Sequence, residues 1–183
     1  HESLGETYKA MSGEAASTLS QAATANPQLD FLVRTNMDAQ IAADRIRGAV
    51  RASNGVSYPR GSLANQLKLI AKMIRGGLRT RVFYASMGGF DTHSGQRGRH
   101  AQLMGQFANA INAFQKDLRE SGDDERVMTM VFSEFGRRVG ENASNGTDHG
   151  TAGPMFVIGK HAKGGVHGRH PNFTKLDSGD LRY

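Results

Sequence analysis

Glycine is the residue that most constrains this chain. It accounts for 23 of 183 residues, about 13%, where an average protein has about 7%. Eighteen of the 23 lie from Gly76 onward. Glycine weakens helix interiors and permits turns that other residues avoid, so this content excludes a coiled coil, and the lack of a Gly-X-Y period excludes collagen. We therefore expect a globular fold whose C-terminal part contains many tight loops.

Composition excludes further classes of protein. There is no cysteine, so the chain has no disulfide, no thiolate metal site and no cysteine nucleophile. No stretch approaches the roughly 18–20 apolar residues of a membrane span. The formal net charge of +6 suits an anionic partner. Nucleic acid is not expected as that partner, because zinc-finger spacing, aromatic RNA-binding motifs and runs of five like charges are all lacking.

Three helices are predicted from apolar residues at helical spacing. The first covers residues 29–52, with Pro27 suited to its first turn, and Ser53-Asn54-Gly55 ends it. The second starts at Ser62, a plausible N-cap, and ends at Gly76-Gly77. The third covers residues 99–119. We treat residues 1–61 as a helical N-terminal segment and residues 62–183 as an α/β domain.

Three short apolar runs are predicted as strands, at residues 81–87, 127–132 and 155–158. The first two flank the third helix and so form a βαβ unit, whose strands are normally parallel. This order predicts a three-layer α/β/α sandwich, with helices on both faces of a mostly parallel sheet.

Potential metal ligands gather at the ends of these runs. Asp91 and His93 follow the first strand, and Glu134 follows the second. Ligands collect at the carboxyl edge of a parallel sheet, so the three should lie together. Asp148 and His149 precede the third strand and can join them only if that strand runs antiparallel.

Carboxylates combined with imidazoles suit Zn²⁺, Mn²⁺ or iron, whereas carboxylates alone favour Mg²⁺ or Ca²⁺. Arg137, just after Glu134, is a candidate catalytic residue that would clamp an anion. The alternative is that these are ordinary capping or solvated loop residues, and that Arg137 is a surface arginine. His161, His167 and His170 have poor ligand spacing and are expected to lie in a solvated basic loop.

Four motifs occur in an order that resembles one bacterial family. They are Gly-Gly-Phe-Asp-Thr-His at 88–93, Ser-Glu-Phe-Gly-Arg at 133–137, Gly-Thr-Asp-His-Gly at 146–150 and Gly-Gly-Val-His-Gly at 164–168. The family is called domain of unknown function 1501 and is grouped with the alkaline phosphatase and sulfatase superfamily. The resemblance runs from about Ser62 to the C-terminus.

The resemblance implies the C-terminal part of an exported, periplasmic or secreted metal-dependent hydrolase. Its substrates would be anionic small-molecule esters of phosphate or sulfate, and its metal zinc or manganese, with calcium or magnesium as alternatives. Asp91, His93 and His149 resemble the ligands of one ion. Phe135 stands where the superfamily often has a histidine, and the nucleophile is expected upstream of His1.

Two other functions stay open on sequence grounds. One is a non-catalytic relative that acts as a binding or cell-envelope module, and the other is a basic module for an anionic polymer. An incomplete sheet would also leave an unpaired edge and an apolar patch, so self-association through the sheet edge is expected.

Overall fold

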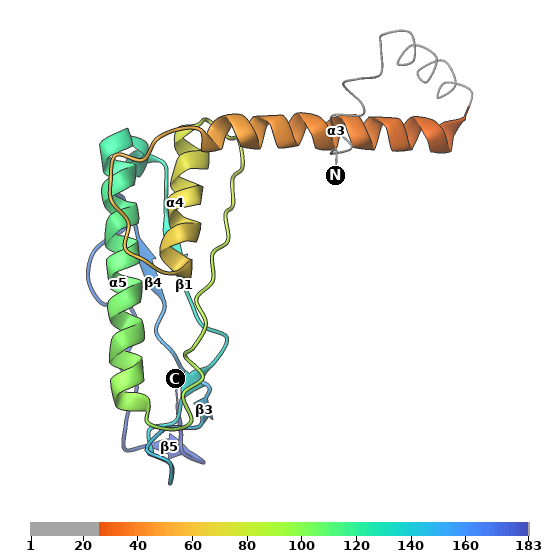
Figure 1. Ribbon diagram of the computed structural model, residues 1–183. Helices are drawn as coiled ribbons and strands as arrows, with labels where there is room; N and C mark the ends of the chain where they lie inside the picture. The colour runs from red at the N-terminus through yellow and green to blue at the C-terminus, as the bar shows by residue number, and fades with distance from the viewer. Residues whose placement is uncertain (1–25, 183) are drawn as a thin grey trace.

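The computed structural model describes residues 26–182 (Figure 1). This part of the chain contains three α-helices, one 3-10 turn and three two-stranded antiparallel sheets. Residues 1–25 of the predicted helical segment lie outside the described residues. The helical elements are α3 (Pro27–Val50), α4 (Ser62–Arg75), α5 (Gln96–Ser121) and the 3-10 turn η1 (Asp123–Glu125).

All three predicted helices are confirmed, with differences at their ends. The side chain of Asn26 accepts hydrogen bonds from the backbone N–H groups of Gln28 and Leu29 and so caps α3, with Pro27 as its first residue. The prediction that Ser62 caps α4 is wrong. Gly61 is the cap residue, and the Ser62 hydroxyl instead accepts a hydrogen bond from Gln66 at 3.1 Å.

The core lies between α4 and α5. α4 buries one face, and the facing side of α5 contributes Ala110, Phe114 and Leu118. Side chains from outside the helices, among them Phe83 and Val127, cover the edges of this cluster. The buried residues of α4 are Ala64, Leu67, Ile70, Ala71 and Ile74.

A buried carboxylate joins the two core helices to the loop that precedes α4. Asp117, on α5, is fully buried, and one of its oxygens pairs with the Arg75 guanidinium at the end of α4. Its other oxygen accepts hydrogen bonds from Asn54 at 2.6 Å and from the Tyr58 hydroxyl at 2.9 Å. Because both oxygens are satisfied, the charge is compensated inside the protein.

The strands in the described part of the chain are short, and all of them pair in antiparallel fashion. β1 (Thr129–Val131) pairs with β4 (Phe156–Ile158), and Met130 lies opposite Val157. β2 (Gly136–Arg137) pairs with β3 (His149–Gly150), and β5 (Leu176–Asp177) with β6 (Asp180–Leu181).

The predicted three-layer α/β/α sandwich with a mostly parallel sheet is therefore wrong. Residues 81–87 are extended but form no strand, so the parallel pairing with residues 127–132 is not made. The backbone of Ser86 hydrogen-bonds the side chain of Gln66, on α4, through both its N–H and its C=O. The Gln66 side chain therefore occupies backbone groups that a neighbouring parallel strand would otherwise pair with. The antiparallel direction expected for the strand at 155–158 is confirmed by its pairing with β1.

The prediction of helices on both faces of the sheet is also wrong. Toward α5, Thr129 contacts Gln115 and Phe156 lies 6.4 Å from Phe107 between ring centroids. On the opposite face, Met130 and Val157 are 59% and 50% exposed. Among residues 26–182, helices therefore cover one face of this sheet only. Within residues 26–182, no helix has both the length and the apolar character to cross a membrane.

Replacing Asp117 with alanine should destabilise the fold by about 3 kcal/mol, because Arg75 would be left without its buried partner. Chemical denaturation followed by circular dichroism measures this loss. Glu120→Ala, at an exposed position on the same helix, is the control and should change stability by less than about 0.5 kcal/mol. Equal effects from the two substitutions would contradict the role given to Asp117.

Stability should also fall in alkaline solution through Tyr58. Burial, together with the hydrogen bond to Asp117, raises the pKa of Tyr58 above its ordinary value. A raised phenol pKa stabilises the folded state fully below the unfolded pKa of about 10, and this contribution is lost as pH rises above it. Tyr58→Phe should cost about 1 kcal/mol near neutral pH and flatten the decline in stability above about pH 10. An unchanged decline in this variant would assign the alkaline sensitivity to other groups.

Candidate metal centre

The candidate site forms where two loops far apart in the sequence meet. Pairing of β2 with β3 places Arg137 opposite His149. The backbone N–H groups of Gly95 and Gln96, where α5 begins, donate to the carbonyls of Ser144 and Asn145. The segment that carries Asp91 and His93 is thereby held against the segment that carries His149.

Two glycines make this close approach possible. A Cβ on Gly146 would overlap the backbone of His93, and a Cβ on Gly150 would overlap the backbone of Arg137. Each clash involves backbone atoms, which cannot move aside as a flexible side chain can. Glycines were predicted around the site. At these two positions the lack of a side chain allows one backbone segment to contact another directly.

Three side chains converge at this junction. The Asp91 carboxylate oxygen lies 2.9 Å from Nε2 of His93 and 2.7 Å from Nε2 of His149. The two Nε2 atoms are 3.3 Å apart, although the residues are separated by 56 positions. All three side chains are about half exposed, at 60%, 49% and 48% respectively. They are the one group of this kind in the described residues with donor atoms close enough for a shared ion.

This donor set fits a tetrahedral transition metal. Ligand atoms at about 2.0–2.1 Å from such an ion lie about 3.3–3.4 Å from one another, which is the separation of the two imidazole nitrogens. The shorter distances to Asp91 are those of hydrogen bonds, and inserting an ion requires a shift of a few tenths of an ångström. Two imidazoles and one carboxylate are ligands that suit zinc or manganese.

Asp148 lies beside this triad. Its carboxylate is 3.4 Å from Nδ1 of His93, the ring nitrogen that faces away from Asp91 and His149. A carboxylate at this position orients a metal-binding imidazole and increases its basicity. The hydrogen bond from Asn142 is the main reason that the pKa of Asp148 lies below its ordinary value, and His93 adds to it. Asp148 thus stands where it would orient His93 if that imidazole bound a metal ion.

The same electrostatics hold Asp91 ionised. Its hydrogen bond with His149 is the main reason that the pKa of Asp91 lies below its ordinary value, and electrostatic interactions with His93, His149 and Arg137 lower it further. An ionised carboxylate is the form that binds a metal ion.

Sequence reasoning missed the roles of Phe135 and Asn142. The Phe135 ring stacks on His149 with centroids 4.0 Å apart and planes 9° apart, and so restricts the rotation of that imidazole. The Asn142 side chain accepts from the backbone of Ser144 and Gly146 and donates to the carbonyl of His93 at 3.0 Å. An asparagine shortly before a glycine is a turn signal that points to the first of these contacts.

Of the other two predicted site residues, Arg137 lies beside the triad and Glu134 does not join it. The Arg137 guanidinium donates to the carbonyls of Phe90 and, at 2.6 Å, Thr147, and its carbon lies 5.1 Å from the centroid of the Phe135 ring. It also lies 3.6 Å from Asp91. Through these contacts Arg137 joins the loop that contains Phe90 to the loop that contains Thr147. Glu134 is exposed and is not a member of the convergent group.

Three histidines of the C-terminal loops, His161, His167 and His170, are not members of the triad. His161 pairs with Glu125 at 2.9 Å, and His167 and His170 contact backbone carbonyls. They lie at exposed loop positions, as predicted for a solvated basic loop.

Comparison with known proteins identifies a family. The sequence matches the family described as protein of unknown function DUF1501 over residues 6–178, so the chain belongs to that family. No curated protein matches the sequence. No solved structure matches it either.

Replacing Arg137 with alanine should loosen both site loops, because two carbonyls lose a charged donor. We expect a loss of about 1.5–3 kcal/mol in the free energy of unfolding, measured by denaturant titration. Lysine at this position should rescue little, since its point charge cannot reach two carbonyls as the planar guanidinium does. Arg138→Ala is the control on the exposed neighbour. Full rescue by lysine would contradict the bridging role.

Proposed function

We propose that this member of the DUF1501 family binds a divalent transition metal through Asp91, His93 and His149, and uses it to hydrolyse phosphate or sulfate esters. The observation that supports the metal site is the convergence of three donor atoms at 2.7–3.3 Å from two distant loops. The support for ester hydrolysis is the motif resemblance described above together with the chemistry of such an ion. When bound, it polarises a phosphoryl or sulfuryl oxygen or acidifies a water molecule.

The protein's own side chains have separate tasks in this proposal. Asp91 supplies negative charge, and His93 and His149 supply neutral nitrogen donors. Asp148 fixes the ring of His93, and Phe135 fixes the ring of His149. Arg137 is a positioning residue that sets the distance between the two loops.

The exposure of the site suits a catalytic metal ion better than a purely structural one. A structural zinc site is normally closed by four protein ligands, whereas catalytic sites keep a position open for water or substrate. Three half-exposed ligands leave such a position. The net charge of +6 favours the approach of an anionic ester.

Isothermal titration with Zn²⁺ and Mn²⁺ tests the metal site. The wild-type protein should bind one ion, and His149→Ala should weaken binding by at least about tenfold, because one of three ligands is lost. His161→Ala is the matched control, since His161 is an exposed histidine that also pairs with a carboxylate. Affinity should decrease as pH falls, because histidine ligands must be neutral to bind. Equal binding by wild type and His149→Ala would exclude this centre.

Hydrolysis of p-nitrophenyl phosphate and p-nitrophenyl sulfate by the metal-loaded protein tests the second half of the proposal. We expect turnover that is lost on chelation and in His149→Ala, and retained in His161→Ala. Tight metal binding without turnover of either ester would keep the metal centre and favour the non-catalytic binding module.

A further inference from the structure

The face of the sheet that lies opposite α4 and α5 is apolar and uncovered. Residues alternate in extended backbone, so the neighbours of the inward-facing Phe83, Thr129 and Phe156 point outward. We call this outward surface the open face. Each of its side chains is between 50% and 82% exposed: Val82, Tyr84, Met128, Met130, Phe132 and Val157.

Such a surface normally has a partner. Large contiguous apolar patches on a soluble protein mark interaction sites, whereas scattered apolar residues need no explanation. On the two strands Met130 lies opposite Val157, so the outward side chains of β1 and β4 adjoin one another.

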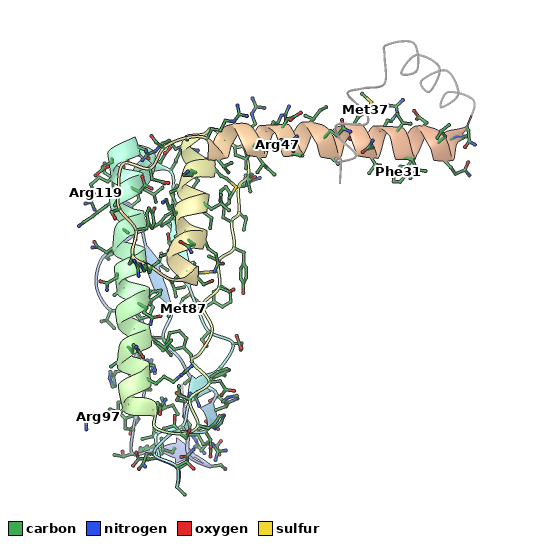
Figure 2. The ribbon with its side chains drawn as sticks, in the orientation of Figure 1. Phe31, Met37, Arg47, Met87, Arg97 and Arg119 are labelled. Atoms are coloured by element: carbon green, nitrogen blue, oxygen red, sulfur yellow. The ribbon has the colours of Figure 1, made fainter. Side chains whose placement is uncertain are left out.

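A second apolar surface lies on α3, exposed at Leu32, Ala39 and Ile46 and partly buried at Ala43 and Val50. Leu32, Ala39, Ala43, Ile46 and Val50 follow one another at intervals of 7, 4, 3 and 4 positions and so share one side of the helix, which we call the α3 face. Phe31 flanks it and is 68% exposed, while Leu32 and Ile46 are 62% and 43% exposed. Figure 2 shows Phe31 and Met37 on opposite sides of α3.

The two surfaces of one chain are held apart. The C-terminal end of α3 is fixed on α4, since a Cβ on Gly76 would overlap the backbone of Ala49, which is 4% exposed. Lys72 donates to the carbonyl of Val50 at 3.3 Å, and Arg75 to that of Ser53 at 2.6 Å. From this anchored end α3 points away from α4, α5 and the sheets (Figure 1).

We propose that the chain forms a two-fold dimer in which the α3 face of each copy covers the open face of the other. A helix laid on the open face would supply the missing second helical layer. The small side chains of Ala39 and Ala43 allow its backbone to approach closely. The reciprocal contact leaves neither surface uncovered, as a two-fold interface requires.

The area is sufficient for a stable dimer. About ten large apolar side chains that each lose on the order of 100 Å² give about 1,000 Å² per contact, and two contacts reach the upper part of the roughly 1,200–2,000 Å² found in stable complexes. This proposal is independent of the metal centre, because neither surface contains Asp91, His93 or His149.

Site-specific cross-linking tests the contact directly, because the chain has no cysteine of its own. Mixing the Leu32→Cys protein with the Met130→Cys protein under mild oxidation should give a covalent heterodimer. Met37→Cys, on the other side of α3, is the matched control and should cross-link poorly with Met130→Cys. A chain that carries both Leu32→Cys and Met130→Cys should link to a second chain. Closure within a single chain would overturn the proposal.

Analytical ultracentrifugation tests the assembly without cross-linking. The wild-type protein should sediment as a dimer, and Leu32→Asp should weaken dimerisation at least about tenfold, while Met37→Asp should not. Circular dichroism verifies that both variants stay helical. A monomeric wild-type protein, or a dimer equally sensitive to both substitutions, would overturn the proposal and point to another occupant of the open face.

Discussion

The candidate site depends on the Arg137 guanidinium, which bridges the carbonyls of Phe90 and Thr147. Asp91 and His93 precede α5 and His149 follows β2, so the ligands must be brought together across two loops. Closing such a separation costs conformational entropy, which grows slowly with length but is always unfavourable. The charged donor between the two carbonyls, the β2–β3 pairing and the Asn142 contacts offset that cost.

A second buried charge, that of Asp117, holds the helical body on which these loops stand. It joins α4, α5 and the loop at residues 54–58. The two networks lie at different ends of α5, whose first residues bind the site loop and whose last turns carry Asp117. Rigid placement of α5 therefore links the stability of the core to the geometry of the donor atoms.

The one-sided covering of the sheet has consequences for both proposals. Helices pack on the face that contains Thr129 and Phe156, and the opposite face presents Met130 and Val157. The proposed metal centre lies at the loops, and the apolar surface lies along the strands. A partner bound to the open face can therefore complete the fold and leave the donor atoms accessible.

The sequence alone determined the helices and supplied the residues that we propose as metal ligands. Asn26-Pro27 and Gly76 mark helix ends through local backbone chemistry, and the Asp-X-His and Asp-His motifs supply recognisable donors. Only the tertiary structure decided the sheet topology and the selection among the donors. Gln66 satisfies the backbone of Ser86, so the apolar run at residues 81–87 makes no ladder. Likewise, Glu134 stays outside the centre and Asp148 stands behind His93, because contacts between distant residues set these positions and no local pattern encodes them.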